Sequence, residues 1–131
     1  MVIKMKVFLS YKWEDRESAN RINGLLNNPN NRYRHLTERE QQDQRNKGEI
    51  AVKNYLKGII SECSALLCLV GNDTQNASGV RYELEVARSL GKKIVAVRIP
   101  NTTGGLPSLL RSWGISETKW NAKNINDALS R

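Results

Sequence analysis

The feature that most constrains the fold is an unbroken apolar run over residues 65–70, followed by a polar loop and then an amphipathic segment. A continuous apolar run of this length is typical of a strand that is buried on both faces. A shorter apolar run lies at residues 7–9, a mainly apolar one with a single arginine lies at residues 94–99, and helical patterns separate the three. Alternating strands and helices imply a parallel sheet covered on both faces, joined by right-handed crossovers. We therefore predict a flavodoxin-like three-layer α/β sandwich with a parallel four- to five-stranded sheet.

The length of 131 residues predicts a single domain over residues 1–131. Hydrophobic residues make up 39% of the chain and charged residues 26%, which is typical of a globular protein. The sequence contains no apolar stretch of the roughly 18 residues that a membrane span requires. Its first ten residues carry lysines within their apolar run and lack the pattern of a signal peptide. We therefore expect a cytoplasmic protein without a membrane partner.

Few residues in the chain are suited to binding a metal. The cysteines are Cys63 and Cys68, whose spacing matches no zinc pattern, and His35 is the single histidine. We expect both thiols to be reduced, His35 to be structural or exposed, and no metal to be bound. The net charge of +8 favours anionic partners, but the basic residues are scattered rather than gathered into a nucleic-acid module. Nucleic acid is therefore an unlikely partner.

The hydrophobic pattern places the individual elements along the chain. A helix should open at the acidic residues Glu14, Asp15 and Glu17, and the polar stretch over residues 37–48 should be an exposed loop or a loose helix. We expect the helix that follows the polar loop to end at Gly91, a residue suited to a helix end. The expected strands are residues 3–9, 32–36, 65–70 and 94–99, and the other expected helices are residues 49–62, 80–90, 106–113 and a last one from residue 122.

Glu83 is the strongest candidate for a functional residue. Helical spacing turns it toward the side of the helix that carries four apolar residues, Val80, Leu84, Ala87 and Leu90. Arg81, Tyr82 and Glu85 project elsewhere, so Glu85 serves as an internal control. Glu83 should also lie near the carboxyl end of the strand at residues 65–70, where ligands bind in open α/β sheets.

Three segments together carry a family resemblance: VFLSYKWED at residues 7–15, LVGNDT at residues 69–74 and VRYEL at residues 80–84. The chain resembles Toll/interleukin-receptor (TIR) domains, and more closely the bacterial TIR-like family that includes the signalling protein of Thoeris anti-phage defence. The resemblance implies a five-stranded flavodoxin-like fold. In catalytically active members it also implies cleavage of the bond between nicotinamide and ribose in NAD, to give ADP-ribose or a cyclic signalling nucleotide.

The resemblance also assigns roles to single residues. Glu83 matches the catalytic glutamate of the family, and Tyr11 and Lys12 match the residues that line the nucleotide pocket after the first strand. Ser10 and Asp15 belong to the same segment. Family members related to Thoeris often carry a tryptophan shortly before the Tyr-Glu pair, where this chain has a glycine, Gly79.

The chemistry of this reaction can be argued from the residues alone. Nicotinamide leaves NAD as a neutral base, so no acid is needed to protonate it, and one carboxylate near the ribose suffices. NAD would be the substrate, and no cofactor is needed. The pyrophosphate could rest on the polar loop and on the backbone N–H groups that open the Glu83 helix. Asn72, Thr74 and Ser78 are candidate hydrogen-bond donors in that region.

Other interpretations stay open at this point. Glu83 could be a partly exposed acid paired with Arg81 or Lys12, and Tyr11 and Trp13 could simply cover the end of the first strand. The domain could be a non-enzymatic TIR-type interaction or nucleotide-sensing module, acting as a homo-oligomer or with another TIR-like subunit. It could also be an enzyme similar to nucleoside deoxyribosyltransferases, whose carboxylate attacks a sugar carbon. Nicotinamide release from NAD would separate these alternatives.

Overall fold

The structure is a computed structural model that describes residues 5–26, 31–34, 36 and 38–131. His35 and the first two residues of the strand expected at residues 3–9 lie outside the described residues. Five strands are present: β1 (Met5–Ser10), β2 (Asn31–Arg34), β3 (Ala65–Val70), β4 (Lys93–Arg98) and β5 (Glu117–Thr118). The helices are α1 (Arg16–Leu26), α2 (Glu38–Arg45), α3 (Glu49–Ile60), α4 (Ser78–Ser89), α5 (Ser108–Ser112) and α6 (Ala122–Ser130), with short 3₁₀ turns η1 (Trp13–Asp15) and η2 (Thr74–Asn76).

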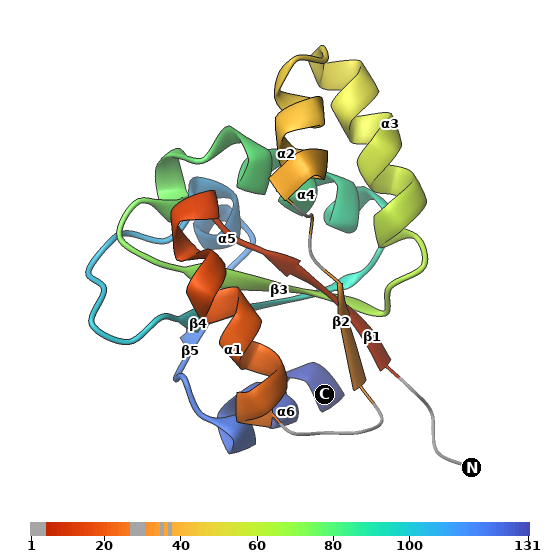
Figure 1. The fold of residues 1–131 in the computed structure, drawn as a ribbon. Coiled ribbons are helices and arrows are strands. Elements are labelled where there is room, and N and C mark those ends of the chain that lie inside the picture. The colour runs from red at the N-terminus through yellow and green to blue at the C-terminus, as the bar shows by residue number, and fades with distance from the viewer. Residues whose placement is uncertain (1–4, 27–30, 35, 37) are drawn as a thin grey trace.

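The strands form one parallel sheet in the order β2-β1-β3-β4-β5 (Figure 1). β3 lies at its centre, and every residue of β3 is buried, as its unbroken apolar sequence predicts. In the register between β1 and β3, Ser10 lies opposite Cys68. The predicted flavodoxin-like α/β class is confirmed. The sheet has five strands, the higher of the two expected numbers.

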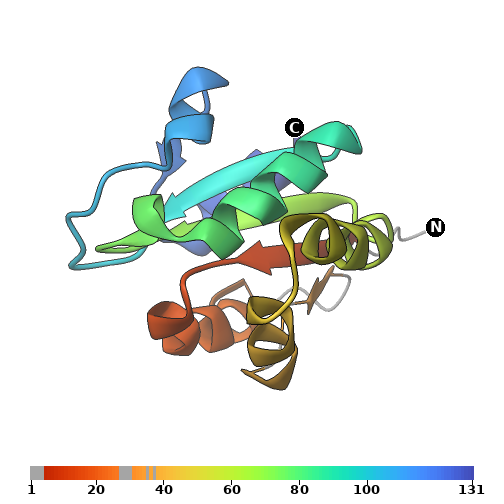
Figure 2. The ribbon, with the colours of Figure 1, turned by 90° about the horizontal axis from the view of Figure 1, so that it is seen from above.

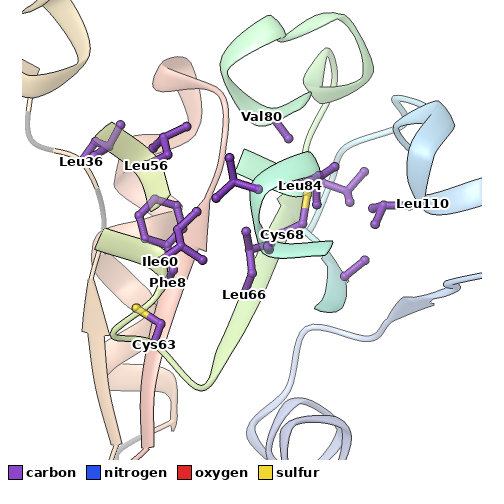
Figure 3. Close-up of a cluster of buried hydrophobic side chains, with 14 of the residues drawn as sticks. Phe8, Leu36, Leu56, Ile60, Cys63, Leu66, Cys68, Val80, Leu84 and Leu110 are labelled. Atoms are coloured by element: carbon purple, nitrogen blue, oxygen red, sulfur yellow. The ribbon is translucent and has the colours of Figure 1, made fainter. Parts of the chain in front are cut away.

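Helices cover both faces of the sheet, which gives the predicted three layers (Figure 1). On one face, α1 and α6 pack through Ile22 and Ile125. On the other, α3, α4 and α5 pack on Phe8 and Leu66, and Figure 2 shows α3 and α4 on this same face. The two apolar layers separate because successive residues of a strand point to opposite faces. Figure 3 shows part of the second layer, in which Leu56 and Ile60 lie near Phe8, while Leu84 lies near Cys68.

The polar stretch between β2 and α3 is a helix, α2, which settles the two expectations for residues 37–48. Tyr55 of α3 holds α2 in place by donating a hydrogen bond of 2.7 Å to Oε1 of Glu40. α2 forms without an apolar stripe, because its residues are all polar or charged.

The end of α4 corrects one prediction. Gly91 has a positive φ of 68°, and the N–H of Lys92 donates to the carbonyl of Ala87, so the glycine ends the helix as expected. However, α4 itself ends at Ser89, and Leu90 is 36% exposed. The prediction that Leu90 shares the buried side is wrong, because the helical period no longer holds where the backbone leaves the helix.

The fifth strand had no expected position in the sequence. β5 consists of Glu117 and Thr118 and pairs with Ala96 and Val97 of β4. The guanidinium of Arg98 donates hydrogen bonds of 3.0 and 2.6 Å to the Oε2 atom of Glu117. Since this edge strand depends on main-chain pairing and an ion pair, it carries no apolar run that could have revealed it.

Candidate active site

A pocket of about 440 Å³ opens at the carboxyl end of β1, within the size range of small-molecule sites. It lies between the residues that follow β1, the helices α2 and α3, and the start of α4. Tyr11, Lys12 and Trp13 contribute the first of these walls, and Ser78 and Glu83 contribute to the last. Parallel β/α folds place ligands at this end of the sheet, so the position agrees with the location predicted from the sequence.

Glu83 lies in the wall of this pocket and is only 7% exposed. The hydroxyl of Ser10, at the end of β1, donates a hydrogen bond of 2.9 Å to Oε1 of Glu83. Burial raises the pKa of Glu83 to about 8, and the hydrogen bond from Ser10 opposes this rise because it favours the ionised form. The site therefore holds an acid that can change its charge near neutral pH.

The alternative ion pairs for Glu83 do not form. Arg81 and Lys53 both bind Glu85 instead, with N–O distances of 3.0 and 2.6 Å, on the outer side of α4. Lys12 binds Asp73. The prediction that Glu83 faces inward and Glu85 outward is thus confirmed, because the side chain of Glu85 is 26% exposed and ion-paired.

Tyr11 forms part of the wall beside Glu83. It is 5% exposed and belongs to the apolar layer beneath α1, against which Trp13 also packs. Burial, with the nearby charge of Glu83 as a smaller cause, raises the pKa of Tyr11 to about 12, so the phenol stays protonated. The guanidinium of Arg16 lies 5.2 Å from the centre of the Trp13 ring. Both aromatic residues therefore cover the end of β1 and line the pocket at the same time.

Lys12 is the cation that lines the pocket from the β1 side. Its Nζ lies 2.6 Å from Oδ2 of Asp73 and 3.8 Å from Oε2 of Glu14. The hydrogen bond to Asp73 raises the pKa of Lys12, and it lowers the pKa of Asp73. This pair connects the segment after β1 to the loop after β3. Ser78, the first residue of α4, lines the pocket from the α4 wall and is exposed.

Ser10 does not line the pocket itself and reaches it only through its hydrogen bond to Glu83, and three other predicted site residues do not line it either. Asp15 packs on Gly71, where an added Cβ would lie 2.4 Å from its Oδ2, and burial raises the pKa of Asp15. Asn72 accepts a hydrogen bond of 2.9 Å from the N–H of Thr103. Thr74 is buried and accepts a hydrogen bond of 2.8 Å from the N–H of Gly71. These residues shape the loop between β3 and α4.

Hydrophobic patterning does not reveal the part of the pocket wall that α2 supplies. Gln41 and Gln44 of α2 and Lys47 just after it line the pocket, and Gln44 is buried with an exposed fraction of 7%. These positions are spaced three residues apart, as one face of a helix requires. A run of polar residues, however, has no hydrophobic pattern that would mark its inner side.

The described part of the chain contains no group of three or more His, Cys, Asp or Glu side chains that could hold a metal ion. Cys63 and Cys68 are both buried and neither is in a disulfide. Burial raises the pKa of the Cys68 thiol, with Glu83 as a smaller cause. Cys68 therefore packs as a small apolar residue beneath the site.

The fold is that of a TIR domain. The crystal structure of the TIR domain of the Toll-related receptor TRR-2 from Hydra magnipapillata is similar to this chain with a TM-score of 0.59. The two share 15% sequence identity, and the similarity covers 95% of this chain and 91% of that chain. At this identity the likeness concerns the fold alone.

The sequence defines the family more narrowly. A family model described as "Thoeris protein ThsB, TIR-like domain" matches residues 8–104, and the chain belongs to this family. It is therefore a TIR-type signalling domain of the Thoeris class of anti-phage defence. A comparison with curated proteins gave no match. None of the helices in the described residues has the length and apolar character needed to cross a membrane.

Proposed function

We propose that this domain cleaves the bond between nicotinamide and ribose in NAD, giving ADP-ribose or a cyclic signalling nucleotide. Glu83 would be its catalytic residue. The observation that supports this most directly is a buried carboxyl group in the wall of a pocket, held by Ser10 rather than neutralised by a basic side chain. Buried carboxyl groups with a raised pKa are concentrated at functional sites.

In the proposed reaction, the bond between C1′ of the ribose and N1 of nicotinamide breaks. Its electron pair stays on N1, which removes the positive charge of the pyridinium ring, and a positive charge develops on C1′ and the ring oxygen. The Glu83 carboxylate stabilises this charge or forms a bond to C1′. Water then attacks C1′, displaces the Glu83 carboxylate where it has bonded, and gives up a proton to that carboxylate or to solvent, which yields ADP-ribose. For a cyclic product, a nucleophile of the same nucleotide attacks C1′ in place of water and loses its proton in the same way.

The reaction requires the ionised form of Glu83, whereas burial favours the neutral form in the empty pocket. The pyridinium of bound NAD would place a positive charge near the carboxyl group and lower its pKa. Substrate binding would therefore itself generate the reactive carboxylate. Lys12, Ser78 and the first N–H groups of α4 would contact the pyrophosphate, since helix starts and cations favour anions. Tyr11 would form part of the wall beside the sugar.

The test is to incubate the protein with NAD and follow nicotinamide release by chromatography for three proteins. We expect Glu83→Gln to lower the rate at least about a hundredfold, the scale on which removing a stabilising charge lowers enzyme rates. Glu85→Gln is the matched control: it is the same change two residues along α4, on the ion-paired outer side, and should leave the rate unchanged. Equal rates for wild type and Glu83→Gln would remove Glu83 from its role. Release of free base from deoxynucleosides with NAD left intact would instead identify an enzyme similar to deoxyribosyltransferases.

The proposal includes a cytoplasmic location and assembly with further copies or with another TIR-like subunit. Ile50, in the first turn of α3, supports assembly, because it is 78% exposed and α3 also lines the pocket. Contact at this helix could order the pocket wall. We expect the specific activity to rise with protein concentration and Ile50→Lys to abolish that rise, as measured by nicotinamide release alongside light scattering. A specific activity independent of concentration would show that the single chain is sufficient.

A further inference from the structure

One buried polar atom in the pocket wall has no hydrogen-bond partner among the described residues: Oε1 of Gln44. Burying an amide oxygen without a donor destabilises a fold, and such atoms are rare in native structures. Gln44 is 7% exposed and lines the same pocket as Glu83. The last torsion of a glutamine side chain is soft, so the amide can turn its oxygen toward the pocket, where a donor on a bound ligand would satisfy it.

The side chains that share the pocket wall with Gln44 do not satisfy its oxygen. α2, which carries Gln44, is fixed to α3 by the hydrogen bond between Tyr55 and Glu40. Val52 and Leu56 of α3 line the same pocket, but they are apolar and cannot donate a hydrogen bond. Gln41 and Lys47 line it too, and neither donates to Oε1 of Gln44. The amide is buried, and one hydrogen bond to a buried group has a large effect on which ligand binds.

We propose that Gln44 is a specificity-determining residue that accepts a hydrogen bond from an N–H group on a base of the bound dinucleotide. The inference rests on the proposed function, because it takes the ligand to be NAD. An amide oxygen only accepts, so it selects ligands by the presence of a donor. NAD offers two such groups on planar rings: the carboxamide of nicotinamide and the amino group of adenine. Both are N–H donors, and the experiment distinguishes them.

The experiment measures binding without turnover, by isothermal titration of the Glu83→Gln protein with three dinucleotides. NAD carries both donors, 3-acetylpyridine adenine dinucleotide lacks the carboxamide N–H, and nicotinamide hypoxanthine dinucleotide lacks the adenine amino group. We expect one of the two analogues to bind about tenfold more weakly than NAD, the scale of one hydrogen bond to a buried acceptor. The weaker analogue identifies the base that Gln44 contacts.

The same titrations are repeated with a protein that carries both Glu83→Gln and Gln44→Met. The second change keeps the approximate size of the side chain and removes the amide. We expect this protein to bind NAD about tenfold more weakly and to bind the discriminated analogue as well as it binds NAD. Gln75→Met is the matched control, because Gln75 is an exposed glutamine that does not line the pocket. It should preserve the preference of the Glu83→Gln protein.

Thermal unfolding without nucleotide separates this role from a structural one. Removing a buried acceptor that lacks a partner should stabilise the empty protein, so Gln44→Met should raise the melting temperature by roughly 3–6 °C. A structural glutamine would lower it. A lower melting temperature, or a preference among the dinucleotides that persists in Gln44→Met, would overturn the assignment.

The two proposals fail in different ways. If Glu83→Gln abolishes nicotinamide release while Gln44→Met leaves the analogue preference intact, the inference about Gln44 is wrong and the proposed function stands. If the protein prefers NAD to one analogue and this preference depends on Gln44, but NAD is never cleaved, the inference about Gln44 stands and the proposed function is wrong. If none of the three dinucleotides binds and the wild-type protein releases no nicotinamide from NAD, both are wrong.

Discussion

Ser10 and Glu83, which are 73 positions apart in the chain, share a buried hydrogen bond of 2.9 Å between the Ser10 hydroxyl and the carboxyl oxygen Oε1. The bond joins the end of β1 to the second turn of α4. It fixes the position of the carboxyl group and favours its ionised form, while burial acts in the opposite direction. The balance between these two effects determines how much of the protein carries a charged Glu83 at neutral pH.

Removing the hydroxyl should therefore shift the pH dependence of the proposed activity. In wild type, kcat/KM for NAD should rise with pH and reach half its maximum near pH 8, the pKa of Glu83 in the free protein. In Ser10→Ala the pKa rises further, so we expect the profile to move to higher pH and the rate at pH 7 to fall roughly tenfold. Nicotinamide release between pH 6 and pH 10 measures both.

Ser89→Ala provides the control for this experiment. Ser89 lies at the far end of α4, where its hydroxyl donates to the carbonyl of Val86. This variant should keep the wild-type profile. A profile for Ser10→Ala that coincides with wild type would show that the hydroxyl does not influence the ionisation of Glu83.

The stability of the protein should depend on pH through the same residue. The pKa of Glu83 is raised from 4.5 to about 8 on folding, so between these values the folded protein binds a proton that the unfolded chain has released. The contribution of this residue to the free energy of unfolding is fully present below pH 4.5 and is lost as the pH rises toward 8. Above pH 8 it changes no further. The loss amounts to up to about 5 kcal/mol.

Glu83→Gln should remove this loss, because glutamine does not ionise and can still accept the hydrogen bond from Ser10. We expect the variant to be several kcal/mol more stable than wild type at pH 8 and nearly equal to it at pH 4.5. Urea unfolding across this range provides the measurement. A constant difference between the two proteins at every pH would contradict the raised pKa.

The sequence could locate Glu83 because a helix of regular period carries it. The apolar neighbours Val80, Leu84 and Ala87 are all buried, and they define a face that includes the acid. The same period failed for Leu90, since α4 ends one residue earlier. Periodicity therefore predicted the inner face of the helix but not the point at which the helix ends.

The parts of the fold and of the site that the sequence did not reveal have a common physical basis. The residues with which α2 lines the pocket, such as Gln44, are polar like those on its outer side, so the two sides show no contrast in hydrophobicity. β5 is held by main-chain pairing and by the ion pair of Arg98 with Glu117, and neither leaves an apolar pattern. Hydrophobic patterning identifies elements that bury apolar surface, and these elements bury little.

Lys12 gives a prediction about affinity and salt. If its ammonium group contacts the pyrophosphate, Lys12→Met should weaken binding of ADP-ribose about tenfold at low salt and make the affinity less dependent on salt. Asp73→Asn should strengthen binding, because Asp73 binds the same ammonium at 2.6 Å and competes with the ligand. Isothermal titration at two salt concentrations tests both variants.

Lys57→Met is the control for Lys12→Met. Lys57 lies on the exposed side of α3 and outside the pocket, so this variant should match wild type. Equal salt dependence in Lys12→Met and wild type would exclude this contact.

Thr74 should contribute to stability rather than to the reaction itself. Its buried hydroxyl accepts from the N–H of Gly71 and donates to the carbonyl of Leu69 at 3.3 Å, which fixes the turn after β3. Thr74→Val keeps the shape and leaves both backbone groups without this partner, so we expect a loss of about 1–3 kcal/mol in the free energy of unfolding. Thr74→Ser retains the hydroxyl and should lose less. Urea unfolding compares the two variants, and equal losses would show that the hydroxyl is not the cause.

Gly104 holds the same loop from the other side. A Cβ at this position would lie 2.3 Å from the carbonyl oxygens of both Gly71 and Asn72, and backbone atoms cannot move aside as easily as a flexible side chain. Gly104→Ala should therefore destabilise the protein by about 1–3 kcal/mol, the usual cost of overpacking. Because Gly71 and Asn72 lead into the turn that precedes α4, the displaced loop should also slow nicotinamide release. Gly58→Ala is the matched control: it lies within α3 with no atom near the added methyl, and it should stabilise the protein by about 0.5–1 kcal/mol. If both variants raised the stability, the close approach at Gly104 would not constrain the loop.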